Sequence, residues 1–394
     1  MVVRAARALV LALMLLVIGA PLVLTLLVQD DPFGRAWLAS PKLGNFVYPL
    51  RPSWTLAGWA SGDFQRRFDR WFAAVVEPRG WVIPLTNQVY YDVFAKSHMY
   101  DRSIVIGRAG ALYEREYVAA WCGADEPAPA AALAEVAARA GALHSHLAKE
   151  GKVLLVLVTP NKASVMTEHL PAGVCPPPRD ADGRRRRFVE LLREHRVPLI
   201  DGHALVAAMK AEDPRPPFPR GGTHWSRLVG VRVAGHVMRE VERLGGVDLG
   251  GVEVRDVRWN ARPERTDRDL ADLLKLFVTP DDYQVAAWAR VCRPTAQGRA
   301  RSLVSVGGSF VFQVLDPINE CRLFRRVENY FYYETLYQRW PDRHSEKPDR
   351  AAMRWRAKLA ETDVVLLEIA EHRIGQAPHF EHFVGDALAG LERD

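Results

Sequence analysis

The sequence predicts an α/β fold in which a parallel sheet is covered by helices, with one transmembrane helix at the N-terminus. Aliphatic runs and helical patterns alternate between residues 152 and 369, as expected of consecutive βα units. The run from Lys152 to Thr159 is almost wholly aliphatic, which is typical of a strand buried on both faces. The run from Ala8 to Val28 is long enough to cross a bilayer.

The N-terminal run has the charge pattern of a membrane anchor. Arg4 and Arg7 precede it, and Gln29-Asp30-Asp31 closes it. At 1.5 Å per residue the helix would extend roughly 30 Å, and the flanking charges predict a cytoplasmic N-terminus. A cleaved signal peptide is the alternative, but the length of the run favours an uncleaved anchor. Both interpretations export the rest of the chain.

Three parts are expected: an anchor at residues 1–30, a juxtamembrane helical segment at 31–100 and a large domain at 101–394. The segment contains a helical pattern from Phe64 to Val76. The formal charge of +6 comes from scattered arginines without interleaved aromatics, which argues against a nucleic-acid partner. Four widely spaced cysteines allow one or two disulfides after export and show no metal-binding spacing, so we expect no metal.

The domain begins with a hairpin pattern, and its later alternation is interrupted once, at about residues 245–300. We interpret this arginine-rich stretch as an irregular insertion with a short helix around Asp269 to Phe277 that borders the cleft. The expected elements are, in order, a hairpin at 101–113, a helix at 127–150, a strand at 152–159, helix 184–195, strand 197–201, helix 204–212, helix 226–244, a strand from 302, a helix after 309 and strand 363–369.

A histidine lies in a turn-forming segment, Pro219 to Ser226, just before a long helical pattern. His224 has the one side chain whose unperturbed pKa lies near neutrality, so it is a candidate general base. A hydrogen-bonded structural histidine is the plainer interpretation. The adjacent Trp225 either shields a reactive intermediate and stacks on substrate or packs in the core.

A serine lies on the turn that leaves a strand, since the apolar run from Ser302 is followed by Gly307-Gly308-Ser309. This geometry exposes a hydroxyl beside the backbone N–H groups of Gly308 and Ser309, which would bind an oxyanion. An ordinary turn with a helix cap is the alternative. Together, His224 and Ser309 indicate acyl transfer or ester hydrolysis.

Polar residues also follow the buried strand that ends at Thr159. Asn161 and Lys162 lie where ligands usually bind in open α/β sheets, so they either bind substrate or cap the next segment. No orienting carboxylate is evident beside the candidate base and nucleophile, because Gly222 and Gly308 have no side chain there.

The chain resembles the alginate O-acetyltransferase family of SGNH-type, GDSL-like proteins. The pieces that carry this resemblance, in order, are the aromatic helix ending near Arg79, the hairpin motif 105–110, the strand end 159–162, the His motif 221–225, the segment 269–274, the Ser motif 306–310 and the strand 364–368. The resemblance implies an SGNH-like sheet, Ser309 as nucleophile and His224 as base.

In that family the His motif usually reads Asp-x-His-Trp and the Ser motif Gly-Asp-Ser, whereas this chain has Gly222 and Gly308 at the aspartate positions. Three explanations stay open: an acid from elsewhere, a Ser-His dyad, or a non-catalytic relative. The candidate acids from elsewhere are Asp201, Asp281, Asp282 and Glu371.

The resemblance implies acetyl transfer through an acetyl-serine to hydroxyls of an exported polysaccharide, without a cofactor. It also implies a periplasmic domain on a single-pass inner-membrane helix, and a membrane-bound O-acyltransferase as the partner that delivers acetyl groups. A carbohydrate acetyl esterase, or a non-catalytic scaffold of a polysaccharide-modification complex, is the alternative.

Overall fold

The structure is a computed structural model that describes residues 2–29, 39–43, 47–97, 103–123, 129–175, 182–280 and 283–392. The chain divides into two compact units, the first formed by residues 1–102 and 271–279 and the second by residues 103–270 and 280–394. All candidate site residues belong to the second unit, so the second unit positions the chemistry.

The first unit is helical. It contains α1 (Val2–Gln29), α2 (Leu56–Ala60), α3 (Asp63–Val75) and α4 (Arg79–Phe94). The expected helix at 64–76 is confirmed as α3, whereas α2 and α4 were not predicted. The expected N-terminal span falls within α1; across the described ranges, no helix meets the length and apolarity required to cross a membrane.

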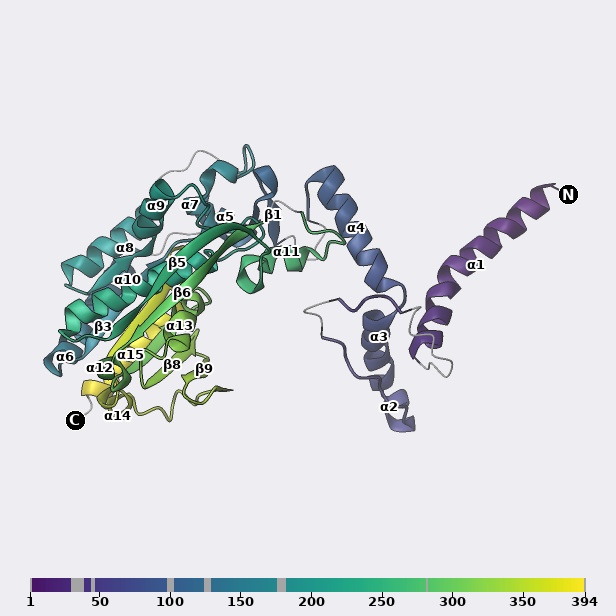
Figure 1. The fold of residues 1–394 in the computed structure, drawn as a ribbon. Helices are drawn as coiled ribbons and strands as arrows, with labels where there is room; N and C mark the ends of the chain where they lie inside the picture. Colours follow the sequence, from purple (N-terminus) through teal and green to yellow (C-terminus); the bar gives the residue numbers. More distant parts are fainter. Residues whose placement is uncertain are drawn as a thin grey trace. The chain divides into compact units, whose positions relative to one another are not determined.

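A seven-stranded sheet forms the centre of the second unit (Figure 1). Its strand order is β10-β9-β8-β7-β11-β3-β4, and the five strands from β8 to β4 run parallel. The predicted parallel sheet is therefore confirmed, with an unpredicted antiparallel edge of β9 and β10. The strands are β3 (Val153–Thr159), β4 (Leu199–Asp201), β7 (Ser302–Gly307), β8 (Arg326–Phe331), β9 (Thr335–Trp340), β10 (His344–Glu346) and β11 (Val364–Ala370).

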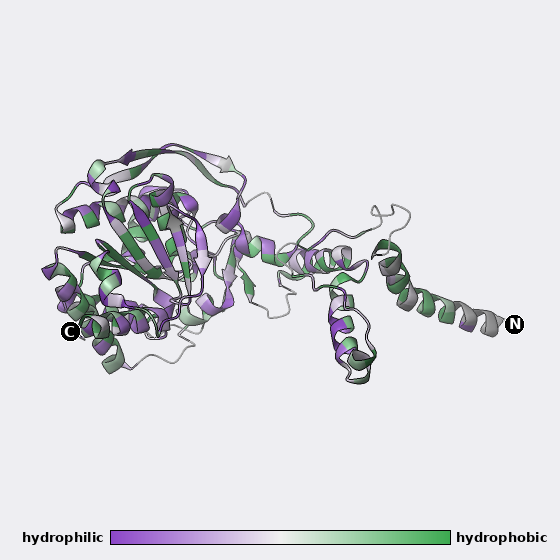
Figure 2. Ribbon diagram, turned by 90° about the horizontal axis from the view of Figure 1, so that it is seen from below, coloured by the Kyte–Doolittle hydropathy of each residue, from purple (hydrophilic) through white to green (hydrophobic). Residues whose placement is uncertain are grey.

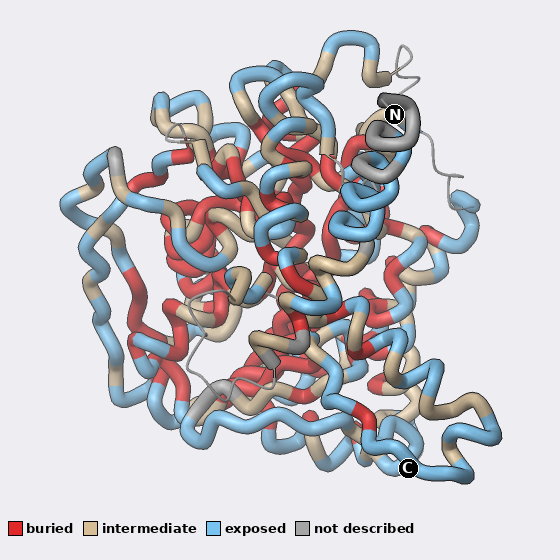
Figure 3. Tube along the Cα trace, turned by 90° about the vertical axis from the view of Figure 1, so that its right-hand side faces the viewer, coloured by how far each residue is buried: buried red, intermediate tan, exposed pale blue. Residues whose placement is uncertain are grey.

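Helices cover both faces of this sheet, which explains the continuous aliphatic strands. Leu155 and Leu157 of β3 pack with α10 (Arg227–Gly245) and α13 (Val311–Glu320). The intervening residues of β3 pack on the opposite face, where α6 (Ala130–Lys149), α8 (Gly183–Glu194) and α15 (Pro378–Glu392) lie. Buried stretches accordingly run through the interior in Figure 3. Burial of each such leucine side chain stabilises the folded state by about 2 kcal/mol.

The prediction of an irregular insertion at 245–300 was wrong in part. Most of this region is a long antiparallel pair, β5 (Gly250–Ala261) and β6 (Val285–Pro294). Val252 packs in the core and the next residue, Glu253, is exposed, which is the alternation expected of a strand with one buried face. The expected short helix is present as α11 (Asp269–Leu274).

The remaining elements frame the sheet. The predicted hairpin is confirmed as β1 (Ile104–Ile106) paired with β2 (Leu112–Glu114). The shorter helices are α5 (Arg115–Trp121), α7 (Lys162–Val165), α9 (Gly202–Glu212), α12 (Ala296–Arg299) and α14 (Trp355–Ala360). Disulfides join Cys122 to Cys175 and Cys292 to Cys321, so β6 is tied to the end of α13.

Candidate active site

The nucleophile turn is built by strand β7, which ends at Gly307 and delivers Ser309 just before α13. The register places the carboxyl ends of β7, β11 and β3 along one edge of the sheet, since Val306 pairs with Leu367 and Thr159 with Ala370. Ser309 is partly exposed, while its neighbours Gly308 and Phe310 are buried. The hydroxyl is therefore held on a rigid turn and still open to a substrate.

The predicted base lies beside this serine. The Nε2 atom of His224 is 2.7 Å from the Oγ atom of Ser309. The His224 ring also packs on Phe310, with 4.8 Å between ring centroids. The pairing that the sequence suggested across 85 residues is therefore present in the fold.

Asp269, at the first position of α11, completes the triad. Its Oδ2 atom is 2.7 Å from Nδ1 of His224, and its Oδ1 atom accepts the backbone N–H groups of Thr223 and Leu270, each at 2.8 Å. Because a carboxylate only accepts, the proton of the neutral imidazole lies on Nδ1. Nε2 is then free to accept the proton of Ser309, which is the arrangement of a Ser-His-Asp triad.

Neither of the two proposed acids that the structure describes occupies this position. Asp201 caps α9 through Ala204 and pairs with Arg185 at 2.5 Å, and Glu371 binds His203 at 3.0 Å. Asp281 and Asp282 lie outside the described residues. The dyad alternative is wrong as well, because Asp269 orients the imidazole. The sequence did contain a signal for Asp269 as the orienting acid, because this aspartate begins the short helix that was expected to border the cleft.

Gly308 is not an oxyanion donor, contrary to prediction. Its N–H donates to the Oε2 atom of Glu368 at 2.6 Å, and the hydroxyl of Thr159 donates to the other carboxylate oxygen. Glu368 is fully buried in β11, and burial raises its pKa against the effect of these two hydrogen bonds. The carboxylate thus fixes the turn that carries the nucleophile.

Tyr332 faces this turn, and no sequence reasoning singled it out. Its backbone N–H donates to the Gly307 carbonyl at 2.9 Å. Burial raises the pKa of the phenol, and hydrogen bonds to the hydroxyl and backbone N–H of Ser309 oppose that rise. Tyr332 and Tyr333 have φ of 47° and 59°. Such left-handed residues cost about 1–3 kcal/mol each and cluster at functional sites.

Two glycines explain how the site differs from the expected motif. A Cβ on Gly222 would lie 2.5 Å from the carbonyl oxygen of Thr266, which leaves no room for an aspartate. A Cβ on Gly308 would lie 3.1 Å from Tyr332 and 3.4 Å from Glu368. The orienting carboxylate therefore comes from Asp269, and Tyr332 fills the space beside Gly308.

The predicted roles of Lys162 and Asn161 in substrate binding are wrong. Lys162 is 1% exposed, and its Nζ donates to the carbonyl oxygens of Pro219, Arg220 and Gly222 at 2.6–2.9 Å. Its burial lowers the pKa to about 7. Asn161 caps α7, as the alternative interpretation held. Lys162 acts instead on the loop that positions His224.

Trp225 is a core residue rather than a substrate contact. Its side chain is fully buried and packs edge-on against Phe310, with 5.5 Å between centroids. Ser226 then caps α10 by accepting the N–H of Val229. The tryptophan therefore anchors the loop from beneath while His224 faces the nucleophile.

A second serine, histidine and carboxylate lie together near the ends of β3 and β11, but they are arranged differently. The hydroxyl of Ser164 donates directly to Glu371, and Nδ1 of His203 lies 3.0 Å from the same carboxylate. The same nitrogen lies 3.4 Å from the Ser164 hydroxyl, so the two ring nitrogens are not divided between hydroxyl and acid as in a triad, and this cluster does not activate its serine.

Asp267, two residues before the triad acid, gives a pH-dependent prediction. Burial raises its pKa from 3.8 to about 6, although the N–H of Arg227 donates to it at 3.0 Å. Between pH 4 and 6 the folded state then binds a proton that the unfolded state does not. Stability conferred by protonation is lost as the pH rises through about 6.

Asp267→Asn should therefore raise the free energy of unfolding at pH 7 by about 2 kcal/mol and leave it nearly unchanged at pH 4. The measurement is the denaturation midpoint of both full-length proteins between pH 4 and 7. Two curves that run parallel across this range would contradict the assignment.

The chain also matches known proteins. The family described as SGNH hydrolase-like domain, acetyltransferase AlgX, matches residues 104–304. No curated protein matches the chain. The O-acetyltransferase domain of Pseudomonas putida AlgJ is similar in structure, with 20% identity, a TM-score of 0.44 and coverage of 70% of this chain and 92% of that one. Pseudomonas aeruginosa AlgX shows 15% identity, a TM-score of 0.46 and coverage of 72% and 67%.

Proposed function

The chain belongs to the SGNH hydrolase-like family of the acetyltransferase AlgX, and we propose that it transfers acetyl groups through Ser309 to hydroxyls of an exported polysaccharide. The observation that carries this proposal is the continuous hydrogen-bonded line from Asp269 through His224 to Ser309, with two distances of 2.7 Å. A nucleophile, a base and an orienting acid in that order are what acyl transfer requires.

The reaction has two halves. In the first, Nε2 of His224 takes the proton of Ser309 as Oγ attacks the carbonyl carbon of an acetyl donor. The tetrahedral intermediate expels the donor's leaving group, which takes that proton from His224, and an acetyl-serine is left. In the second, a glycan hydroxyl gives its proton to His224 and attacks the ester. The glycan ester forms, and Ser309 regains the proton.

The developing negative charge is held by the Ser309 N–H and the phenol of Tyr332. In the resting site the hydroxyl and the backbone N–H of Ser309 lower the pKa of the phenol, against the effect of burial. A substrate oxygen that enters between the phenol and the Ser309 N–H would accept a hydrogen bond from each. The phenol thus replaces the Gly308 N–H, which Glu368 occupies.

Tyr332→Phe should therefore lower the rate of Ser309 acetylation by about 10², the usual effect of losing one oxyanion donor. The measurement is burst-phase acetylation by an activated ester. The control is Tyr333→Phe, since that phenol donates to Asp386 at 2.9 Å, away from the nucleophile. A burst rate for Tyr332→Phe equal to that of the Tyr333 variant would contradict the role.

The domain works in the periplasm on a single-pass inner-membrane anchor. Support comes from the mostly hydrophobic described residues of α1 (Figure 2) and from the arginines that precede the apolar run. The two disulfides suit an oxidising compartment. Acetyl-CoA is cytoplasmic, so a membrane-bound O-acyltransferase delivers the acetyl group across the membrane to Ser309.

The test uses purified full-length protein incubated with an activated acetyl ester. We expect the mass of one acetyl group to be added and to map to Ser309, and a polysaccharide acceptor to speed its loss while gaining an ester. Adduct loss at the same rate with and without acceptor would indicate an esterase. A folded protein that forms no adduct would be the non-catalytic scaffold.

A further inference from the structure

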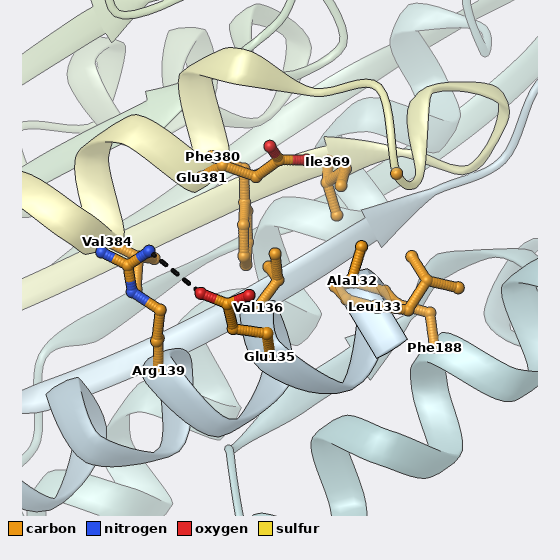
Figure 4. A pocket seen from close by; sticks show the side chains of 11 residues that line it. Ala132, Leu133, Glu135, Val136, Arg139, Phe188, Ile369, Phe380, Glu381 and Val384 are labelled. Atoms are coloured by element: carbon orange, nitrogen blue, oxygen red, sulfur yellow. Dashed lines mark ion pairs between the residues drawn. The ribbon is translucent and has the colours of Figure 1, made fainter. Parts of the chain in front are cut away.

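A polar cleft of about 510 Å³ lies beside α13, the helix that follows the nucleophile. Its lining includes Arg265, Asn319, Tyr337, Gln338, Arg343 and His344. A second hollow, between α6 and α15 (Figure 4), has about 190 Å³ and is lined largely by apolar side chains such as Leu133 and Phe380. That hollow belongs to the opposite face of the sheet, whereas the polar cleft lies on the face that α13 covers.

The walls of the cleft lead to the triad. On one side Arg265 opens a short 3₁₀ turn, Arg265–Asp267, that ends two residues before Asp269. On the other, α13 begins two residues after Ser309, and Asn319 lies about 12 Å further along it. Phe312 of α13 contacts Tyr337 at 5.8 Å between ring centroids. The elements that carry the acid and the nucleophile therefore also border the cleft.

Asn319 is the most informative residue of the lining. Its side chain is 5% exposed, yet neither its amide nitrogen nor its amide oxygen has a hydrogen-bond partner. A buried amide left in this state costs about 1–3 kcal/mol per unpaired atom. Asn329 of β8 is likewise buried with both amide atoms unpartnered, and it lies on the same face of the sheet as the core residue Val327. Of these two residues Asn319 lines the cleft, so the lining includes one amide without hydrogen-bond partners.

The chemistry of the lining fits a chain of sugars. An amide offers a donor and an acceptor side by side, which complements the neighbouring hydroxyls of a sugar ring. The half-buried ring of Tyr337 offers an aromatic surface, and Gln338 adds a second amide. Arg265 and Arg343 are exposed at the cleft, while Asp316 and Glu320 supply negative charges. The amides can bind the hydroxyls of neutral and anionic sugars alike. The charged side chains of the cleft therefore determine which of the two binds more tightly.

We propose that the cleft formed by α13, the 3₁₀ turn at Arg265 and the β9–β10 edge is a subsite for the acceptor glycan, which holds sugar units next to the one acetylated at Ser309. This inference rests on the proposed function, because it assigns the glycan's path to the same site. It makes Asn319, Tyr337 and Gln338 binding residues that contact the glycan but not the reacting atoms.

Binding is tested without catalysis, in full-length Ser309→Ala protein titrated with cellohexaose or with a hexamer of galacturonic acid. We expect one of the two to bind, and Asn319→Leu in the same background to weaken its Kd at least tenfold. Leucine keeps the volume of the side chain and removes the unpaired amide, so the unfolding midpoint should stay equal or rise. Asp342→Asn, an exposed change in the β9–β10 turn outside the lining, should leave the Kd unchanged.

The outcomes separate this inference from the proposed function. Unchanged glycan affinity in Asn319→Leu, a lowered unfolding midpoint of that variant, or no binding of either hexamer would each overturn the subsite. The absence of an acetyl adduct at Ser309 in the wild type would instead overturn the proposed function. Tighter binding of the uronate than of the neutral hexamer would identify Arg265 and Arg343 as charge-reading residues, and the reverse order would assign recognition to the amides alone.

Discussion

Replacing Ser309 by alanine will lower the rate of acetyl transfer by on the order of 10⁶ and remove the acetyl-enzyme, because the covalent step has no other nucleophile. In a triad the serine and histidine act as one unit, so His224→Ala should cost about as much, and the double variant little more. The measurement is single-turnover transfer from an activated acetyl ester to a polysaccharide, together with the intact mass of the protein.

The matched control is Ser164→Ala, which alters a second serine that lies beside a histidine and a carboxylate. Its hydroxyl donates to Glu371, and its contact with Nδ1 of His203 is longer, at 3.4 Å. We therefore expect the rate to stay within twofold of wild type, roughly the scatter of such measurements. An adduct that persists in Ser309→Ala and disappears in Ser164→Ala would reverse the assignment.

Changing Asp269 to asparagine should lower the same rate by on the order of 10⁴, through the tautomer of His224. The N–H groups of Thr223 and Leu270 hold the Oδ1 position, so the amide oxygen stays there and the amide nitrogen faces His224 Nδ1. The imidazole then turns its acceptor toward residue 269 and its N–H toward Ser309. Because the fold is kept, the unfolding midpoint should change little.

Asp201→Asn and Glu371→Gln serve as controls, since both are carboxylates at the carboxyl edge of the sheet. Asp201 pairs with Arg185 and Glu371 with His203, so their loss should weaken stability and leave the chemical step intact. A rate loss in Glu371→Gln as large as that in Asp269→Asn would show that Asp269 is not the sole orienting acid.

The nucleophile and base could be predicted because each depends on a short local pattern. A strand followed by glycines and a serine specifies the Ser309 turn, and a glycine turn before a helix exposes His224. The third member was missed because its position depends on a contact across 45 residues. Its short helix lies in the connection between β5 and β6, two strands that the arginine-rich composition had disguised as an irregular insertion.

The oxyanion site was predicted less well for a related reason. The N–H of Gly308 points toward a strand 60 residues later, where Glu368 interrupts an otherwise aliphatic sequence. A lone glutamate in a fully buried strand requires partners, so it was a readable signal. Nothing local marks Tyr332, because its role depends on a left-handed turn that only the pairing of β8 with β9 creates.

The two glycines that precede the base and the nucleophile also constrain how this site can change. A single substitution to aspartate at Gly308 would press its side chain against Tyr332 and Glu368, and one at Gly222 would meet the backbone of Thr266. The step at Gly222 is therefore blocked by backbone atoms, whereas the step at Gly308 requires the Tyr332 side chain to shift by a few tenths of an ångström. A smaller residue at 332 would relieve the contact at Gly308, so substitutions at 308 and 332 are coupled. Engineering the usual motif into this site therefore takes accompanying changes as well as the two aspartates.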